Sequence, residues 1–130
     1  MNRQMRSVLI LDDNEAVRKS LEAYFEDCTW RVLCAESAED ALDLLRHDMA
    51  DCAVVDIRLP GMVGNAFIRQ AATMCPDMVF VICTGSPRYQ LPADVAELPV
   101  VSSEIFNKPV GQLNELKQHL LDMIEQNNII

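Results

Sequence analysis

The sequence predicts an α/β fold in which a doubly wound parallel sheet of five strands carries helices on both faces. Short apolar runs alternate with longer segments in which apolar residues recur every three or four positions. Strands that are apolar on both faces and separated by amphipathic helices are typical of a parallel sheet buried on both sides. A chain of 130 residues holds five such strand–helix repeats, so we expect one domain over residues 1–130 with a core over about 6–127.

The first half of the chain supplies three of the predicted strands. They are the apolar runs SVLIL (7–11), WRVLCA (30–35) and CAVVD (52–56). A first helix is expected from Glu15, and a second after Ser37, which with Asp40 forms a capping pattern. A third helix is expected over about 65–74, after a turn at Pro60–Gly61.

The second half supplies the other two strands and an irregular connection between them. The strands are the runs MVFVICT (78–84) and EIFNK (104–108), and a leucine stripe predicts a last helix from Gln112 to about Asn127. Between the two strands, Pro87, Pro92 and Pro99 interrupt the chain. Because proline breaks helices, the fourth helix is expected to be short or irregular, near residues 93–98.

Composition narrows the function classes. The net charge is −9, and no cluster of lysine and arginine could neutralise phosphates, so we expect no direct nucleic-acid binding by this chain. No run approaches the ~18 apolar residues of a membrane span, so no membrane association is expected. The five cysteines form no C-x-x-C pair, and we interpret them as reduced thiols of a cytoplasmic protein.

Polar residues stand where four of the predicted strands end. Asp12 and Asp13 follow the first strand, Asp56 ends the third, Thr84 the fourth and Lys108 the fifth. In doubly wound folds the ligand crevice lies beyond the carboxyl ends of the strands, so these residues should converge. Three carboxylates in one place need a cation, and an all-oxygen set without histidine or cysteine favours Mg²⁺.

The same residues suit phosphoryl chemistry. A metal, the Thr84 hydroxyl and the Lys108 ammonium would together neutralise the oxygens of a phosphoryl group. The carboxylate of Asp56 is then a plausible nucleophile.

With these strand-end residues, the chain resembles the receiver domain of two-component response regulators over essentially its whole length. The matching pieces are LILDDNEAVR, VVDIRLPGMVG, VICTG and FNKPV, in the family's order and near its spacing. The resemblance implies a flavodoxin-like sheet with strand order 2-1-3-4-5. It also implies a phosphorylation switch rather than an enzyme acting on outside substrates.

The resemblance assigns a role to each strand-end residue. Asp56 matches the phosphoacceptor, which takes a phosphoryl group from a sensor histidine kinase or a histidine phosphotransfer protein. Asp13, Asp56 and the backbone carbonyl of Arg58 match direct Mg²⁺ ligands, with Asp12 acting largely through water. Lys108 matches the phosphoryl contact, and its bond to Pro109 is expected to be cis.

Thr84 matches the switch hydroxyl, whose movement would alter a partner surface. The output would be a downstream protein target or an output domain outside this chain.

The sequence departs from the family at the switch aromatic. The family places Tyr or Phe three residues before the lysine, where this chain has Ile105, and the nearest aromatic is Phe106. A shift of one residue along a strand turns a side chain to the opposite face. An interaction-only receiver, which is never phosphorylated, is therefore one alternative.

A small phosphatase with an aspartyl nucleophile is the other alternative. Such enzymes place a second acid two residues after the nucleophile. This chain has Arg58 at that position, which disfavours the phosphatase.

Overall fold

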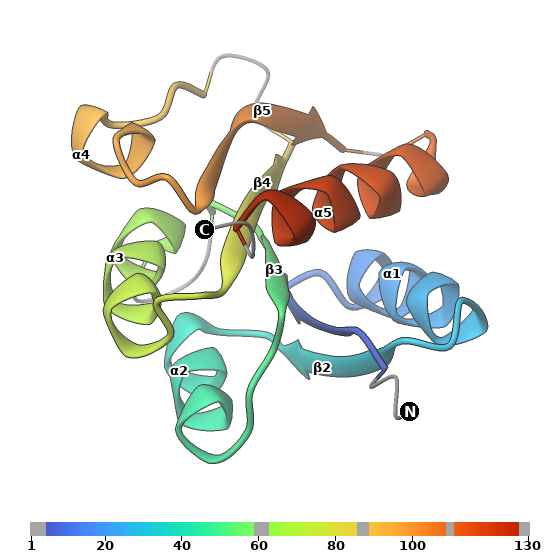
Figure 1. The fold of residues 1–130 in the computed structure, drawn as a ribbon. Helices are drawn as coiled ribbons and strands as arrows, with labels where there is room; N and C mark the ends of the chain where they lie inside the picture. The colour runs from blue at the N-terminus through green and yellow to red at the C-terminus, as the bar shows by residue number, and fades with distance from the viewer. Residues whose placement is uncertain (1–4, 59–62, 86–88, 109–110, 128–130) are drawn as a thin grey trace.

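The fold is a five-stranded parallel sheet between two layers of helices (Figure 1). In this computed structural model the described residues are 5–58, 63–85, 89–108 and 111–127. The elements in chain order are β1 (Ser7–Leu11), α1 (Glu15–Asp27), β2 (Arg31–Ala35), α2 (Ala38–His47), β3 (Cys52–Val55), α3 (Gly64–Met74), β4 (Val79–Thr84), α4 (Ala93–Ala96), β5 (Val101–Asn107) and α5 (Leu113–Asn127).

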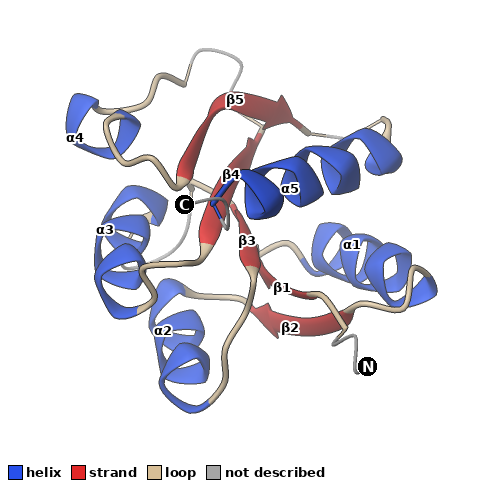
Figure 2. Cartoon of the chain, viewed as in Figure 1, coloured by secondary structure: helices blue, strands red, loops and turns tan. Residues whose placement is uncertain are grey.

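The strand order is β2-β1-β3-β4-β5, and every neighbouring pair is parallel, which confirms the predicted fold class. Helices α2, α3 and α4 cover one face of the sheet, and α1 and α5 cover the other (Figure 2). The order reverses between β1 and β3, so the carboxyl ends of these two strands flank the switch point where doubly wound folds bind ligands.

Alternate residues of the buried strands belong to two separate hydrophobic cores, one on each face of the sheet. Leu9 and Leu11 of β1 pack with α2 and α3 residues, whereas Val8 and Ile10 pack with α1 and α5 residues. All four are fully buried. A strand with both faces packed in this way is a rigid support for whatever follows it.

The predicted helix starts are borne out by their caps. Asn14 caps α1 by accepting the amide hydrogen of Val17, and Ser37 caps α2 by accepting that of Asp40. The predicted short fourth helix is also confirmed, because α4 spans only Ala93–Ala96.

The start of β5 was predicted wrongly, since the strand begins at Val101 and not at Glu104. Phe80 pairs with Val101 but Ile82 pairs with Ile105, so one residue of β4 faces three of β5. A bulge of this kind breaks the period of two that marks a strand in sequence. The Ser102 hydroxyl stabilises the bulge by accepting the Glu104 amide hydrogen and by bonding Nε2 of His119, 2.7 Å away.

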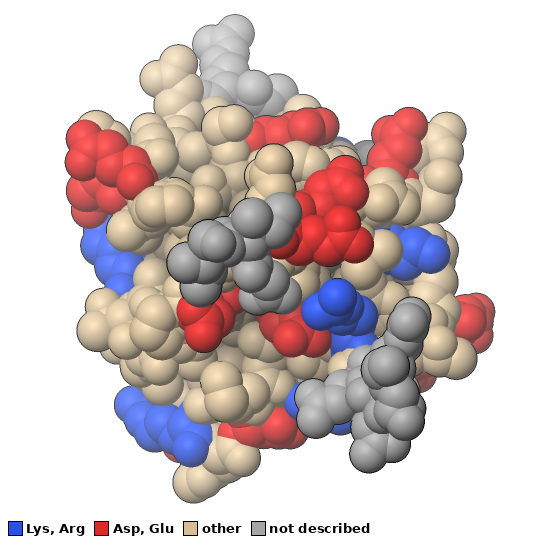
Figure 3. Space-filling model, viewed as in Figure 1, with Lys and Arg blue, Asp and Glu red and all other residues tan. Residues whose placement is uncertain are grey.

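The surface is acidic, in keeping with the net charge of −9. Carboxylate side chains are spread over the face shown in Figure 3, with fewer lysines and arginines between them. Within the described ranges, no helix has both the length and the apolar character needed to cross a membrane.

Four of the five cysteines are expected to be unreactive in the folded protein. Burial is the largest influence on these four thiols and raises the pKa of each. The pKa of Cys34 is raised to about 11 and that of Cys83 to about 12, and the pKa values of Cys52 and Cys75 are raised as well. Thiol reactivity follows thiolate fraction and access, so burial suppresses it in these four. Cys28 differs from the three buried cysteines because it is half-buried, and from Cys34, which is also half-buried, because its sulfur lies 3.7 Å from Nζ of Lys117.

We therefore expect an aromatic disulfide reagent at pH 8 to label one thiol quickly in the native protein and the other four more slowly, by ~10-fold or more. Absorbance of the released thiolate measures both phases, and Cys28→Ser should remove the fast phase alone. Rapid labelling of two or more thiols before unfolding would contradict this expectation.

Candidate functional site

The candidate site lies at the carboxyl edge of the sheet, where residues from four strands meet. Asp12 follows β1, Asp56 follows β3, Thr84 ends β4 and Lys108 follows β5. Asp12, Asp56 and Thr84 are all buried. Each sits at or just past the end of its strand, as the sequence predicted.

Backbone hydrogen bonds hold three of these residues in register with the neighbouring strand. The amide of Asp12 donates to the carbonyl of Ala35, and the amide of Asp56 donates to the carbonyl of Leu11. The amide of Lys108 donates to the carbonyl of Thr84 at 2.9 Å. The ladder thus continues one residue beyond each strand, and the side chains are positioned by the sheet rather than by a loose loop.

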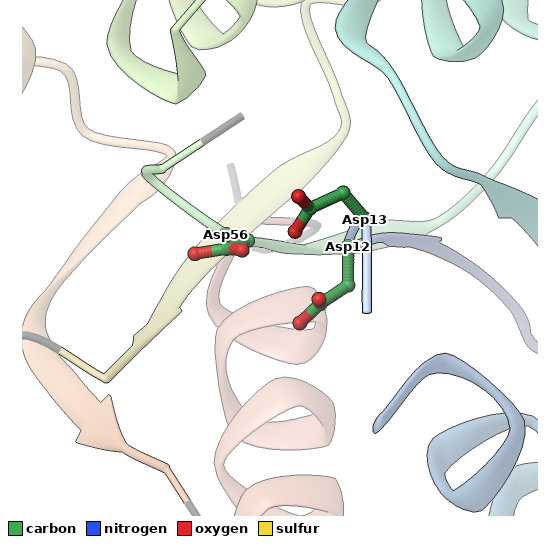
Figure 4. Close-up of side chains that lie close together, drawn as sticks. All are labelled: Asp12, Asp13 and Asp56. Carbon is green, nitrogen blue, oxygen red and sulfur yellow. The ribbon is translucent and has the colours of Figure 1, made fainter. Parts of the chain in front are cut away.

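Asp12, Asp13 and Asp56 form a cluster in which one carboxylate oxygen from each lies within 4.8 Å of the others. Figure 4 shows the three side chains beside one another at the ends of β1 and β3. Asp12 and Asp56 are buried, whereas Asp13 is exposed. The cluster therefore opens to solvent on the side of Asp13.

Lys108 is the cation of the site. Its Nζ lies 2.7 Å from Oδ2 of Asp12 and 3.1 Å from Oδ2 of Asp56. Only 16% of the Lys108 side chain is exposed, so little water screens these contacts. The lysine therefore bridges the two buried acids.

The titration of the site reflects burial and this bridge together. Burial is the largest influence on Asp56 and raises the pKa of its carboxyl, although Lys108 opposes the shift. For Lys108, burial is again the largest single influence and favours the neutral amine. Hydrogen bonds and charge from Asp12 and Asp56 together outweigh it, so the pKa of Lys108 is raised. Lys108 is thus held in its charged form.

The donor chemistry of the cluster fits a hard divalent cation. Its ligand atoms are carboxylate oxygens only, and a single lysine does not balance three acids. Mg²⁺ prefers few carboxylates in a site that keeps several waters, and the exposed Asp13 leaves room for them. Asp12, Asp13 and Asp56 would hold the ion.

Three residues that were not predicted as site residues shape the site. Asn14 donates its amide hydrogen to Oδ1 of Asp12, and Arg18 donates to the Asp12 carbonyl. A Cβ atom on Gly64 would lie 2.5 Å from the carbonyl oxygen of Asp56. No sequence signal marked this close approach, since the third helix was expected over about 65–74, whereas α3 begins at Gly64.

The segment after Asp56 folds back against its carboxylate. The amide of Arg58 donates to Oδ1 of Asp56 at 3.2 Å, and the amide of Gly64 donates to the carbonyl of Ile57. The predicted turn at Pro60–Gly61 and the expected cis bond at Pro109 fall on residues outside the described ranges.

Ile105 and Phe106 point to opposite faces of the sheet, as the sequence predicted. Ile105 packs with the core under α2, α3 and α4, whereas Phe106 packs with the core under α1 and α5. The Phe106 ring lies 5.7 Å from the ring of His119 on α5. No aromatic ring of β5 therefore stands on the α4 side of Thr84.

A second set of contacts joins the segments that follow Asp56 and Thr84. The Tyr89 hydroxyl hydrogen-bonds Oδ1 of Asn65, and Arg69 forms an ion pair with Asp94 of α4. The short α4 is thereby fastened to α3.

Comparisons with known proteins point to one family. The family model of the response regulator receiver domain matches residues 8–121. The C4-dicarboxylate transport transcriptional regulatory protein DctD of Rhizobium meliloti (strain 1021) is 35% identical over 79 residues, which are 61% of this chain and 17% of DctD. Response regulator MprA of Mycolicibacterium vanbaalenii is 30% identical over 109 residues, 84% of this chain and 46% of MprA.

Among solved structures, a CheY-like response regulator receiver domain protein from Methanospirillum hungatei JF-1 superposes with a TM-score of 0.77 at 23% identity. The alignment covers 95% of this chain and 99% of that one, and it supports the fold. The chain spans less than half the length of the two sequence relatives described above.

Proposed function

The chain belongs to the response regulator receiver domain family, and we propose that it is a phosphorylation switch whose phosphoacceptor is Asp56. The observation that carries the proposal is the position of Asp56, which is buried beside two further acids and bonded to Lys108. We propose further that residues 1–130 form one cytoplasmic receiver domain.

In the proposed reaction an oxygen of the Asp56 carboxylate attacks the phosphorus of a phosphohistidine, so that a P–O bond forms as the P–N bond breaks. The carboxylate must be ionised to attack, and Lys108 favours that form against the effect of burial. Mg²⁺ at Asp12, Asp13 and Asp56, with the Arg58 carbonyl as a further ligand, would offset charge on the transferred oxygens. Lys108 would turn from the carboxylates to the phosphoryl group.

Thr84 is the proposed source of the structural response. Its hydroxyl would bond the new phosphoryl oxygen, and the backbone after β4 would follow. Because Ile105 has no ring to swing, we propose that the change reaches α4 through the segment that includes Tyr89. The Tyr89 hydroxyl already hydrogen-bonds Asn65, which lies on α3, the helix that follows Asp56 in the chain.

The proposed partners follow from this chemistry. A sensor histidine kinase or a histidine phosphotransfer protein supplies the phosphoryl group, and a downstream protein or an output domain outside this chain receives the signal. No outside substrate is turned over, so the protein is proposed to be a regulator and not an enzyme in the metabolic sense.

The proposal is tested with acetyl phosphate and Mg²⁺ as a minimal donor system. We expect a mass increase of one phosphoryl group that is lost in Asp56→Asn and in the presence of a chelator. Asp51→Asn is a matched control, since Asp51 lies at the opposite edge of the sheet, and it should be labelled like the parent. Intact-protein mass spectrometry reads all four samples.

The other outcomes identify the rival functions. If beryllofluoride and Mg²⁺ leave the amide spectrum unchanged and no label appears, the protein is an interaction-only receiver. Turnover of an unrelated phosphoester that depends on Asp56 would indicate the phosphatase instead. Arg58, which occupies the position of that enzyme's second acid, speaks against the phosphatase.

A further inference from the structure

A groove of about 530 Å³ opens at the edge of the sheet opposite the acidic cluster. It lies where β1 and β2 begin and where the chain enters β3 and β4, and the end of α5 closes one side. The residues that matter for its chemistry are Met5, Met49, Asp51, Asp77, Met78 and Ile124. None of them takes part in the proposed phosphorylation.

The groove gathers exposed apolar side chains. Met49 is 67% exposed and Met5 is 57% exposed, the two highest values among the large apolar residues that the structure describes. Both line the groove, together with the buried Met78. Exposed apolar side chains grouped in one place mark interaction surfaces, and methionine adapts its shape to different partners.

Met49 is presented by a fixed backbone. The carbonyl of Met49 accepts a hydrogen bond from Nη2 of Arg31 at 2.7 Å, and its amide donates to Oδ1 of Asp48 at 2.8 Å. Asp48 is itself paired with Arg31. Because both polar groups of its backbone are bound, Met49 exposes its side chain without the loop being loose, which lowers the entropic cost of docking.

The polar groups of the lining are largely used within the protein. Oδ2 of Asp51 accepts the amide hydrogen of Ser7, and the Ser7 hydroxyl accepts the amide hydrogen of Asp51. Arg31 is occupied by Asp48 and Met49. Few donors are left to orient a small polar ligand, so the groove suits aliphatic side chains.

The charge of the groove is acidic. Among the described residues that line it, Arg31 is the one cation and is balanced by Asp48, whereas Asp51 and Asp77 form no ion pair with any residue that the structure describes. We propose that this groove docks a basic, amphipathic segment of a partner protein. Its aliphatic side chains would contact Met5, Met49 and Ile124, and its lysine or arginine side chains would lie beside Asp51 and Asp77.

The first test uses a fluorescein-labelled peptide with the repeated pattern Leu-Lys-Lys-Leu and the full chain labelled with ¹³C at the methionine methyl groups. We expect saturable binding with chemical-shift changes at Met5, Met49 and Met78. Met74 is also exposed but does not line the groove, and its signal should not move. The same peptide with glutamate in place of lysine should not bind.

Matched variants locate the binding energy. Met49→Gln is expected to weaken peptide binding at least ~5-fold and Asp77→Asn by about 3-fold, the latter less in high salt. Met74→Gln should leave the affinity unchanged. Circular dichroism of each variant reports whether the fold is intact.

Equal affinities of Met49→Gln and Met74→Gln, or shifts spread evenly over all methionines, would overturn the proposal, because the peptide would then bind by net charge alone. Absence of saturable binding would overturn it as well. Binding to Asp56→Asn should match the parent, since the groove and the phosphorylation site lie at opposite edges of the sheet. A failure of the proposed function would therefore leave this test unaffected.

Discussion

Replacement of Lys108 by methionine is expected to lower the free energy of unfolding by about 3 kcal/mol when Mg²⁺ is withheld. Lys108 Nζ bridges Oδ2 of Asp12 and Oδ2 of Asp56, whose side chains are only 3% and 5% exposed. Methionine preserves the length of the side chain but removes its charge, which leaves two buried carboxylates without their cation. Urea unfolding followed by circular dichroism measures the loss.

Two controls separate this effect from a general effect of the substitution. Lys19→Met breaks the ion pair between Lys19 and Glu15, whose two side chains are 67% and 71% exposed. This variant should change the free energy of unfolding little, because such exposed pairs contribute at most about 1 kcal/mol. Millimolar Mg²⁺ should restore much of the stability of Lys108→Met, because the ion replaces the missing positive charge. Equal losses in the two variants, or no response to Mg²⁺, would contradict the role assigned to Lys108.

Asp56→Asn should act in the opposite direction in the same assay. Burial raises the pKa of Asp56 above its unfolded value, so the folded state binds the proton more tightly. The stabilisation that comes from the protonated Asp56 carboxyl is present at low pH and is lost as the pH rises through the pKa of Asp56 in the folded state. At neutral pH the ionised Asp56 therefore costs folding free energy, and a neutral asparagine should remove that cost and partly rescue Lys108→Met.

The strand ends could be read from the sequence because a parallel sheet brings the same end of every strand to one edge. Asp12, Asp56 and Lys108 each follow a buried apolar run, and their positions depend only on where those runs stop. The opposite facing of Ile105 and Phe106 followed from the same geometry, since neighbouring residues of a strand alternate faces.

The contacts that could not be predicted from the sequence are those that follow no helical or strand repeat. The bulge of β5 places Ser102 against His119 through a spacing that no alternation rule predicts. The double contact of Lys108 depends on the distance between two strand ends, and the fixed backbone of Met49 depends on Arg31, 18 residues away in the chain. Each of these contacts depends on how strands and loops are aligned with one another in space, which the pattern of apolar residues does not determine.

Gly64→Ala is expected to lower the free energy of unfolding by about 2–3 kcal/mol. The added Cβ would lie 2.5 Å from the carbonyl oxygen of Asp56 and 2.9 Å from Cα of Ile57. Both contacts are with backbone, so neither can be relieved by a change of rotamer. The chain after Asp56 would have to move, and with it the Arg58 amide that bonds the Asp56 carboxylate.

Gly111→Ala is the matched control, because nothing lies within 4 Å of a Cβ at that position. It should leave stability unchanged or raise it by up to about 1 kcal/mol, since alanine restricts the unfolded chain. Affinity for beryllofluoride with Mg²⁺ should fall in Gly64→Ala and remain at the parent value in Gly111→Ala. If Gly64→Ala were as stable as the parent but failed to bind beryllofluoride, the glycine would serve the site alone. Loss of both properties would show that one close backbone contact supports the fold and holds the phosphoacceptor segment in place.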